Sequence, residues 1–144
     1  MATVNPYLNF RGNTEEAFNF YKSVFGTEFR FVLKFKDTPD GDKMSDEDKE
    51  KIMHISLPVG DNMVLMGTDS LESAGHTFNA GNNFSLAIAP ASEEEADKLF
   101  NALSAGGTIT MPLSKVFWGA YFGMLTDKFG TQWMVNFEGK QPGK

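Results

Sequence analysis

The sequence predicts an α+β protein in which two βαβββ modules form a cupped, mixed eight-stranded sheet with helices on its outer face. Two observations lead to this prediction. The same order of one strand, one helix and three strands occurs twice along the chain, and the two helical segments align at an offset of roughly eighty residues, which is typical of internal duplication. In that alignment Ala17 matches Ala96 and Tyr21 matches Phe100. The predicted divisions of this single domain are module one (1–70), a connector (71–82), module two (83–138) and a tail (139–144).

The first strand is predicted at Val4–Phe10, and a turn and a helix follow it. Thr14 is the candidate N-cap of the helix, because Glu15 and Glu16 in the first turn oppose the positive end of the helix dipole. Gly26 ends the helix. The residues at helical spacing that form its apolar face are Phe18, Tyr21, Val24 and Phe25.

The rest of module one is predicted to contain three strands and one polar loop. The β-branched and aromatic residues of Thr27–Phe35 indicate a strand. A solvated acidic loop follows at Asp37–Glu50, in which Ser45 caps a short turn. Ile52–Val59 and Asn62–Gly67 then form a hairpin.

Module two repeats this order after the Gly- and Asn-rich connector. A strand is predicted at Phe84–Ala89, and Ser92 caps a helix that begins with three glutamates. Ala96, Leu99, Phe100 and Leu103 form the apolar face of this helix, and Gly106 and Gly107 end it. The remaining predicted strands are Thr108–Ser114, Ala120–Thr126 and Gln132–Phe137.

Composition narrows the class of protein. The chain carries 13 Lys and Arg against 19 Asp and Glu, a formal net charge of −6, which argues against a general nucleic-acid binder. It has no cysteine, which excludes disulfides and thiolate sites. No apolar run approaches the roughly 18 to 20 residues that span a bilayer, and the N-terminus does not resemble a signal peptide. We therefore expect a cytoplasmic protein that is not bound to a membrane, with a polar, frayed tail.

Side chains alternate between the two faces of a strand, so each strand can be sorted into two columns. One column is apolar and suits the face that the helices cover; it includes Met53, Ile55 and Leu57, Phe84, and Trp133. The other column faces either solvent or a concave ligand cleft. It has no Lys, Glu or Asp, and this favours the cleft. The predicted cavity residues in this column are Asn5, Tyr7, Asn9, His54, Ser56, Asn83, Ser85, Met134 and Asn136, and Met66 is a further cavity candidate outside the strands sorted in this way.

The sequence offers few groups for catalysis. It has no phosphate-binding Gly-rich loop, no His-Glu-x-x-His and no Gly-x-Ser-x-Gly. His54 is the best catalytic candidate, as a general base or a hydrogen-bonding group, and the alternative is a histidine satisfied by its polar neighbours. His76 is expected to be an exposed connector residue. Phe117 and Trp118, beside Gly119, form either a pocket wall to which Phe122 also belongs or plain packing.

Several segments together resemble a known family. They are Asn5–Phe18, Phe20–Tyr21, Val24–Gly26, Asp48–Lys49, Ile52–His54, Leu65–Asp69, Trp118–Gly123 and Asp127–Trp133. Through them the chain is similar to the PhnB-like branch of the glyoxalase/bleomycin resistance/dioxygenase superfamily, also called vicinal oxygen chelate proteins. The resemblance implies a cupped sheet in each module, two cups that close around a cavity, and a homodimer. The branch is often labelled a demethylubiquinone methyltransferase, but the sequence lacks the Gly-rich loop of a nucleotide-binding fold, so we do not extend that activity to this chain.

The resemblance also implies where a metal would be held. Metal-dependent relatives place His, Gln or Glu ligands at positions that fall near Asn5, Met66, Asn83 and Met134 in this chain. An amide or a thioether is a poor ligand for the hard or borderline divalent ions that this fold holds, so we predict no metal and no cofactor. The leading hypothesis is thus a protein that binds a small molecule in a metal-free cavity. The alternatives are an enzyme in which His54 performs acid–base chemistry, with Tyr7, Asn9 or Ser56 orienting the substrate, and a metal-dependent lyase, isomerase or dioxygenase.

Overall fold

The computed structural model describes residues 2–139; the rest of the predicted tail, 140–144, lies outside the described residues. The chain divides into two compact units, Met1–Ala80 and Gly81–Lys144. Each unit contains four strands and one long helix in the order strand, helix, three strands, which confirms the two predicted βαβββ modules. The eight strands form two four-stranded mixed sheets, one in each module. No helix among residues 2–139 has the length and apolar character needed to cross a membrane.

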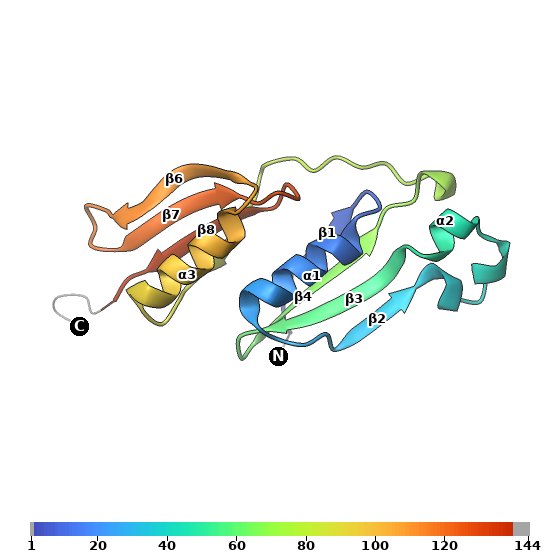
Figure 1. Ribbon diagram of the computed structural model, residues 1–144, viewed down its shortest axis with the longest axis horizontal. Coiled ribbons are helices and arrows are strands. Elements are labelled where there is room, and N and C mark those ends of the chain that lie inside the picture. Colours follow the sequence, from blue (N-terminus) through green and yellow to red (C-terminus); the bar gives the residue numbers. More distant parts are fainter. Residues whose placement is uncertain (1, 140–144) are drawn as a thin grey trace. The chain divides into compact units, whose positions relative to one another are not determined.

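The first module contains a sheet with the strand order β1-β4-β3-β2. Strand β1 runs parallel to β4, and the other neighbours are antiparallel. Helix α1 packs against β3 and β4 on one face of this sheet, as Figure 1 shows. The elements are β1 (Tyr7–Phe10), α1 (Thr14–Phe25), β2 (Phe31–Lys34), three short helical turns at Phe35–Asp37, Gly41–Lys43 and Glu72–Ala74, α2 (Asp46–Lys49), β3 (Ile52–Val59) and β4 (Met63–Asp69).

The second module repeats the topology with the strand order β5-β8-β7-β6. Strand β5 is parallel to β8, and the remaining pairs are antiparallel. Helix α3 packs on one face of the sheet (Figure 1), and the hydroxyl of Ser92 accepts a hydrogen bond from the Glu95 amide at 3.0 Å, which confirms the predicted cap. The elements are β5 (Leu86–Ile88), α3 (Glu93–Ser104), β6 (Thr108–Lys115), β7 (Tyr121–Thr126) and β8 (Gln132–Phe137).

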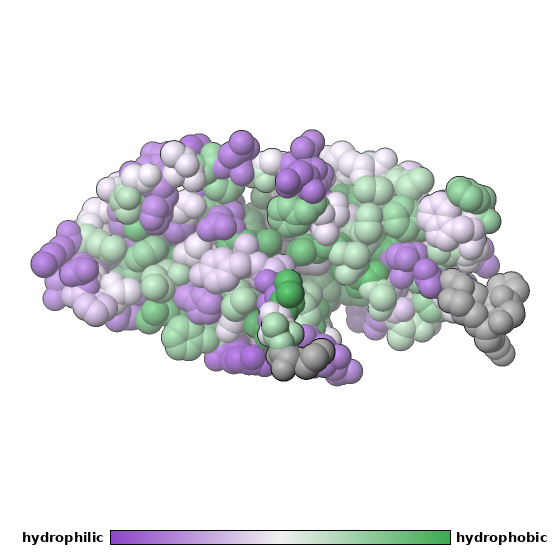
Figure 2. Space-filling view, turned by 180° about the vertical axis from the view of Figure 1, so that it is seen from behind, coloured by the Kyte–Doolittle hydropathy of each residue, from purple (hydrophilic) through white to green (hydrophobic). Residues whose placement is uncertain are grey.

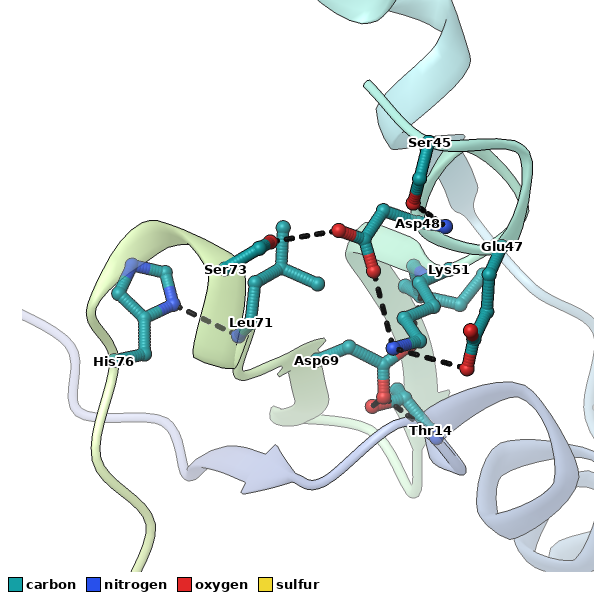
Figure 3. Close-up of polar contacts among 10 residues, drawn as sticks. Thr14, Ser45, Glu47, Asp48, Lys51, Asp69, Leu71, Ser73 and His76 are labelled. Atoms are coloured by element: carbon teal, nitrogen blue, oxygen red, sulfur yellow. Dashed lines mark hydrogen bonds and ion pairs between the residues drawn. The ribbon is translucent and has the colours of Figure 1, made fainter.

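The start of α1 differs from the prediction. Asn13 is the N-cap, and Thr14 is the first helical residue. The Asp69 carboxylate, at the end of β4, accepts hydrogen bonds from the Thr14 amide at 3.0 Å and the Thr14 hydroxyl at 2.6 Å (Figure 3), and from the Ile52 amide at 2.8 Å. Asp69 is only 2% exposed, so these hydrogen bonds fix α1, β3 and β4 to one another inside the module.

Glycine lets each long helix approach its sheet closely. A Cβ atom built at Gly67 of β4 would lie 2.6 Å from the ring of Phe18, and one built at Gly123 of β7 would lie 2.8 Å from the ring of Phe100. Both phenylalanines are buried and belong to the apolar helix faces predicted from the sequence. Helix packing in each module therefore requires a strand position without a side chain.

The predicted apolar column is wrong at two residues. Met53 is 39% exposed whereas Ile52 is fully buried, because the pairing of β2 with β3 shifts by one residue beside Met53 and breaks the alternation. Phe84 precedes β5 and is exposed. The prediction holds for Trp133, which is completely buried.

A small polar network joins the predicted acidic loop (37–50) to the predicted connector (71–82), as Figure 3 shows. Ser45 caps α2 by accepting a hydrogen bond from the Asp48 amide at 3.1 Å, as predicted. The Asp48 carboxylate accepts hydrogen bonds from the Ser73 hydroxyl at 2.7 Å and from the Lys51 ammonium group at 3.2 Å. These two interactions, the Ser73 bond foremost, lower the pKa of Asp48. His76 is exposed, as expected, and its Nδ1 accepts a hydrogen bond from the Leu71 amide.

Candidate functional site

Each sheet has one face that its long helix does not cover. In the first module, strand pairing places Tyr7 beside Met66, Met66 beside Ser56 and Ser56 beside Phe31. Paired residues on neighbouring strands point to the same face, so these side chains form one row across the sheet. We call this surface the first helix-free face; its residues are Tyr7, Asn9, Phe31, Leu33, His54, Ser56, Met66 and Thr68.

Tyr7, on the edge strand β1, and His54, on β3, come together on the first helix-free face. The Tyr7 hydroxyl and the His54 Nδ1 are 3.1 Å apart, within hydrogen-bond distance. The His54 ring lies between two aromatic rings, with centroid distances of 5.6 Å to Tyr7 and 5.8 Å to Phe31. Tyr7 is 45% exposed and Phe31 is 48% exposed, so both rings offer apolar surface beside the imidazole.

The Tyr7 hydroxyl determines what the imidazole can do. Burial raises the pKa of Tyr7, and a hydrogen bond with Thr68 opposes that rise. A phenol with a raised pKa is protonated at neutral pH and can donate to Nδ1, which leaves the His54 Nε2 as an N–H donor. The same hydroxyl can instead rotate and accept from an Nδ1–H group, which leaves Nε2 as a base. The pair therefore supports both ligand binding and proton transfer.

The other predicted residues of the first module lie around this pair. Ser56, in the row itself, is almost fully buried, and Asn9 is exposed at the position paired with Thr68. Asn5 precedes β1, and its side-chain oxygen accepts a hydrogen bond from the Val64 amide at 2.9 Å. Asn5 thus connects the chain before β1 to β4, and this bond occupies its oxygen.

In the second module the predicted residues are brought together only in part. Met134 pairs with Met124, and Asn136 pairs with Phe122, whose ring lies 5.8 Å from the Trp118 ring. Figure 2 shows hydrophobic side chains, coloured green, at the surface in the half that contains this module. We call this surface the second helix-free face; its residues are Ala87, Met111, Ser114, Phe122, Met124, Met134 and Asn136.

Asn83 and Ser85 precede β5 and lie outside the paired strands. Trp118 lies in the loop between β6 and β7, half-exposed, and its neighbour Phe117 is almost entirely exposed. The rings of Phe117 and Trp118 meet edge to face at 4.9 Å. The aromatic pair is therefore a loop feature that contacts the second helix-free face only through Trp118 and Phe122.

Seven residues of these faces were absent from the predicted site, namely Phe31, Leu33, Thr68, Ala87, Met111, Ser114 and Met124. Phe31 was assigned to a strand without being sorted by face, and its contact with His54 depends on a register that only the structure provides. Thr68, Met111 and Met124 also become visible through strand pairing. The alternation of Phe122 and Met124 in the sequence was a usable signal for the last of these.

The donor groups do not fit the divalent metal that this fold holds in metal-dependent relatives. Among residues 2–139, no group of three or more His, Asp or Glu side chains could hold a metal ion. Asn5, Met66, Asn83 and Met134, which fall near the corresponding positions, carry amides and thioethers. Neither group is a favoured ligand of hard or borderline divalent ions.

Comparisons with known proteins identify the family. A family model described as 3-demethylubiquinone-9 3-methyltransferase matches residues 2–136. The chain is 29% identical to protein YjdN of Escherichia coli K12, with 96% of this chain and 97% of YjdN covered. Among solved structures, it is similar to protein PA1353 from Pseudomonas aeruginosa, with a TM-score of 0.85, 40% identity, and coverage of 96% of this chain and 98% of that one.

A second solved structure, from Bacillus cereus, bears the name of a putative 3-demethylubiquinone-9 3-methyltransferase, PhnB protein. Its TM-score is 0.77 at 28% identity, and the match covers 94% of this chain and 99% of that one. A glyoxalase/bleomycin resistance protein/dioxygenase family enzyme from Burkholderia phytofirmans shares the fold, with a TM-score of 0.62 at 20% identity over 93% of this chain and 98% of that one. The family description names an activity and assigns no reaction to this chain. The chain belongs to this PhnB-like family, and it shares its fold with a glyoxalase/bleomycin resistance protein/dioxygenase family enzyme.

Proposed function

We propose that the protein binds a small organic molecule on the first helix-free face, through the Tyr7–His54 pair and without a divalent metal. The hydrogen bond between Tyr7 and His54 is the observation that carries this proposal. In the proposed binding state the Tyr7 hydroxyl donates to Nδ1, and the Nε2–H group of His54 is then available to a hydrogen-bond acceptor. The half-exposed rings of Tyr7 and Phe31 supply apolar contact on either side of that donor.

This arrangement defines the ligand by its chemistry. A suitable molecule has a carbonyl or carboxylate oxygen that accepts from Nε2–H, and a flat apolar body that packs against the two rings. The paired positions of this face carry neutral side chains, such as Ser56 and Met66, so the ligand needs no strong charge. A ligand of the same shape without the oxygen loses one hydrogen bond and leaves the donor unpaired.

Acetophenone and ethylbenzene form a matched pair of probes, because they differ in the carbonyl oxygen and share the aromatic body. We expect acetophenone to bind about two- to tenfold more tightly, since one hydrogen bond contributes about 0.5–1.5 kcal/mol. Titrations followed by NMR of the protein measure both affinities. Equal affinities, or binding that does not involve the first helix-free face, would contradict the proposal.

Two variants with matched controls assign the effect to the pair. Tyr7→Phe keeps the ring and removes the hydroxyl, and Tyr121→Phe makes the same change on β7 of the second module, where the hydroxyl donates to Asp97. His54→Gln removes the imidazole of the pair, and His76→Gln removes the other histidine of the chain. Loss of acetophenone binding in the Tyr7 and His54 variants alone supports the proposal. Wild-type affinity in His54→Gln would refute it.

A second candidate function, acid–base catalysis by His54, is favoured by the ability of the Tyr7 hydroxyl to donate or accept. In this alternative, Nε2 removes a proton beside a substrate carbonyl while Tyr7 accepts from Nδ1–H. Deuterium exchange into the methyl group of acetophenone in D2O tests it by mass spectrometry. Acceleration by the wild type that His54→Gln abolishes supports catalysis, whereas equal rates with both proteins would exclude this reaction.

The homodimer and the cytoplasmic location remain predictions. Light scattering of the purified full chain tests the dimer, for which a mass of twice 15.9 kDa is expected. A mass of 15.9 kDa at micromolar concentration would contradict it.

A further inference from the structure

Three methionines lie side by side on the second helix-free face, one on each of three neighbouring strands. Met134 of β8 pairs with Met124 of β7, and Met124 pairs with Met111 of β6. Cβ atoms of a regular antiparallel pair lie about 4.5–5.5 Å apart, a spacing that applies to Met124 and Met134. Met111 also pairs with Met124, at a point where the register of β6 shifts on either side of it. Met124 therefore has a long, flexible thioether side chain on each side of it, and we call the three residues the methionine row.

The surroundings of the methionine row are neutral. The pairs that flank it on β7 and β8 are Phe122 with Asn136 and Thr126 with Gln132. The opposite face, which packs against α3, contains Leu125, Trp133 and Val135 and no methionine on these two strands. The chain has no cysteine, so thioethers are its only sulfur ligands. The row thus presents soft, uncharged donors without a neighbouring carboxylate or ammonium group at the paired positions.

We propose that the methionine row binds one soft monovalent cation, Cu(I), for which Ag(I) is a redox-stable substitute. Thioethers are selected by soft ions such as Cu(I), whereas carboxylates and imidazoles suit harder ions. The chemistry that makes Met134 a poor ligand for Zn(II) or Mn(II) therefore makes it a suitable ligand for Cu(I). A neutral ligand set also suits a single positive charge better than two, because no carboxylate balances the second.

The exposure of the row fits an ion that enters from solvent. Met111 lies on β6, at the edge of the sheet, and is 39% exposed, while Met124 and Met134 are half-buried. Methionine side chains rotate freely about three bonds, so the thioethers on either side can turn toward Met124 without movement of the strands. This binding involves no covalent or redox step and is independent of the ligand proposed for the first helix-free face.

NMR of the full chain with ¹³C-labelled methionine methyl groups tests the proposal directly. On addition of AgNO₃ we expect the signals of Met111, Met124 and Met134 to shift together and to saturate at about one equivalent. The signals of Met53 and Met66, in the first module, serve as internal controls and stay in place. The absence of any shift, or equal shifts at Met66, would overturn the proposal, as would the same response to Zn(II).

Competition with the Cu(I) chelator bicinchoninate, without oxygen, measures the affinity of each variant. Met124→Leu removes the central sulfur at nearly constant volume, and Met66→Leu makes the same change on the first helix-free face. We expect Met124→Leu to bind Cu(I) about tenfold or more weakly, and Met66→Leu to match the wild type. If Met124→Leu is poorly folded by circular dichroism, Met111→Leu at the exposed edge replaces it. If Met124→Leu, or Met111→Leu in its place, binds Cu(I) as tightly as Met66→Leu does, the methionine row is not the site.

Discussion

Replacement of Asp69 by asparagine tests whether the buried carboxylate holds the first module together. One carboxylate oxygen accepts from both the amide and the hydroxyl of Thr14, and the other accepts from the Ile52 amide. In Asp69→Asn an NH₂ group replaces one of these oxygens and faces a donor. A buried donor without a partner costs about 1–3 kcal/mol, and hydrogen bonds that lose their charged acceptor weaken by about 1 kcal/mol each.

Burial of a neutral amide in place of a charged carboxylate offsets part of this loss. We therefore expect the free energy of unfolding to fall by about 2–4 kcal/mol, which corresponds to a decrease of about 1–3 M in the urea midpoint. Circular dichroism at about 222 nm follows the unfolding of the helices. Both tryptophans, Trp118 and Trp133, lie in the second module, so their fluorescence reports that module separately.

Asp61→Asn, in the exposed turn between β3 and β4, is the matched control and should leave the urea midpoint unchanged. Thr14→Val removes only the hydroxyl and should cost about 1 kcal/mol. If the three buried hydrogen bonds stabilise the module, altering them must lower the free energy of unfolding. Urea unfolding of Asp69→Asn with the same midpoint and slope as that of Asp61→Asn would therefore refute the reasoning.

Three further predictions follow from the packing and the polar network. Gly123→Ala should lower the melting temperature, because the new methyl group would lie 2.8 Å from a helix ring and 2.9 Å from the β6 backbone; an unchanged temperature would contradict the close packing. Ile52→Ala should cost about 2–5 kcal/mol in urea unfolding and Met53→Ala less than about 1 kcal/mol, and the reverse order would contradict the shifted register. The carboxyl of Asp48 should titrate by ¹³C NMR below its ordinary pKa, and Ser73→Ala should move that pKa upward. Because the folded-state pKa of Asp48 is lowered, its carboxylate stabilises the fold fully at pH values above the ordinary carboxyl pKa, and this stabilisation is lost as the pH falls through the lowered pKa. A pKa of Asp48 that Ser73→Ala leaves unchanged would contradict the assigned cause.

The element order was predictable because it depends on local signals. Helix periodicity, the Ser45 and Ser92 caps and the turn glycines all act within a few residues, and the helices and most strands lie where they were expected. The Asp69 interaction was not predictable, since Asp69 and Thr14 are 55 residues apart. The Asp69 carboxylate accepts from the Thr14 amide, which in a locally capped helix would bond to a nearby side chain. The displacement of Met53 has a similar origin, because a bulge depends on the partner strand as well as on the sequence of its own strand.

The candidate site was predictable as a set of residues and not as a set of contacts. Alternation placed Tyr7 and His54 on one face, but their hydrogen bond joins residues 47 positions apart and requires the register of β1, β4 and β3. The connection of Asn5 to Val64 and the location of Asn83 outside β5 likewise depend on where pairing begins. The methionine row likewise becomes visible only through strand pairing, and Met134 was its one residue in the predicted site.

The measurement that most directly tests the proposed site is ¹⁵N NMR of the two imidazole rings of the full chain, with and without acetophenone. We predict that neutral His54 carries its proton on Nε2, with Nδ1 accepting from Tyr7, and that acetophenone shifts the Nε2 resonance of His54 and leaves His76 unchanged. Tyr7→Phe should reduce both the tautomer preference and the shift. Acetophenone that leaves the His54 resonances in place, or that shifts those of His76 equally, would contradict the assignment of this pair as the ligand-binding site.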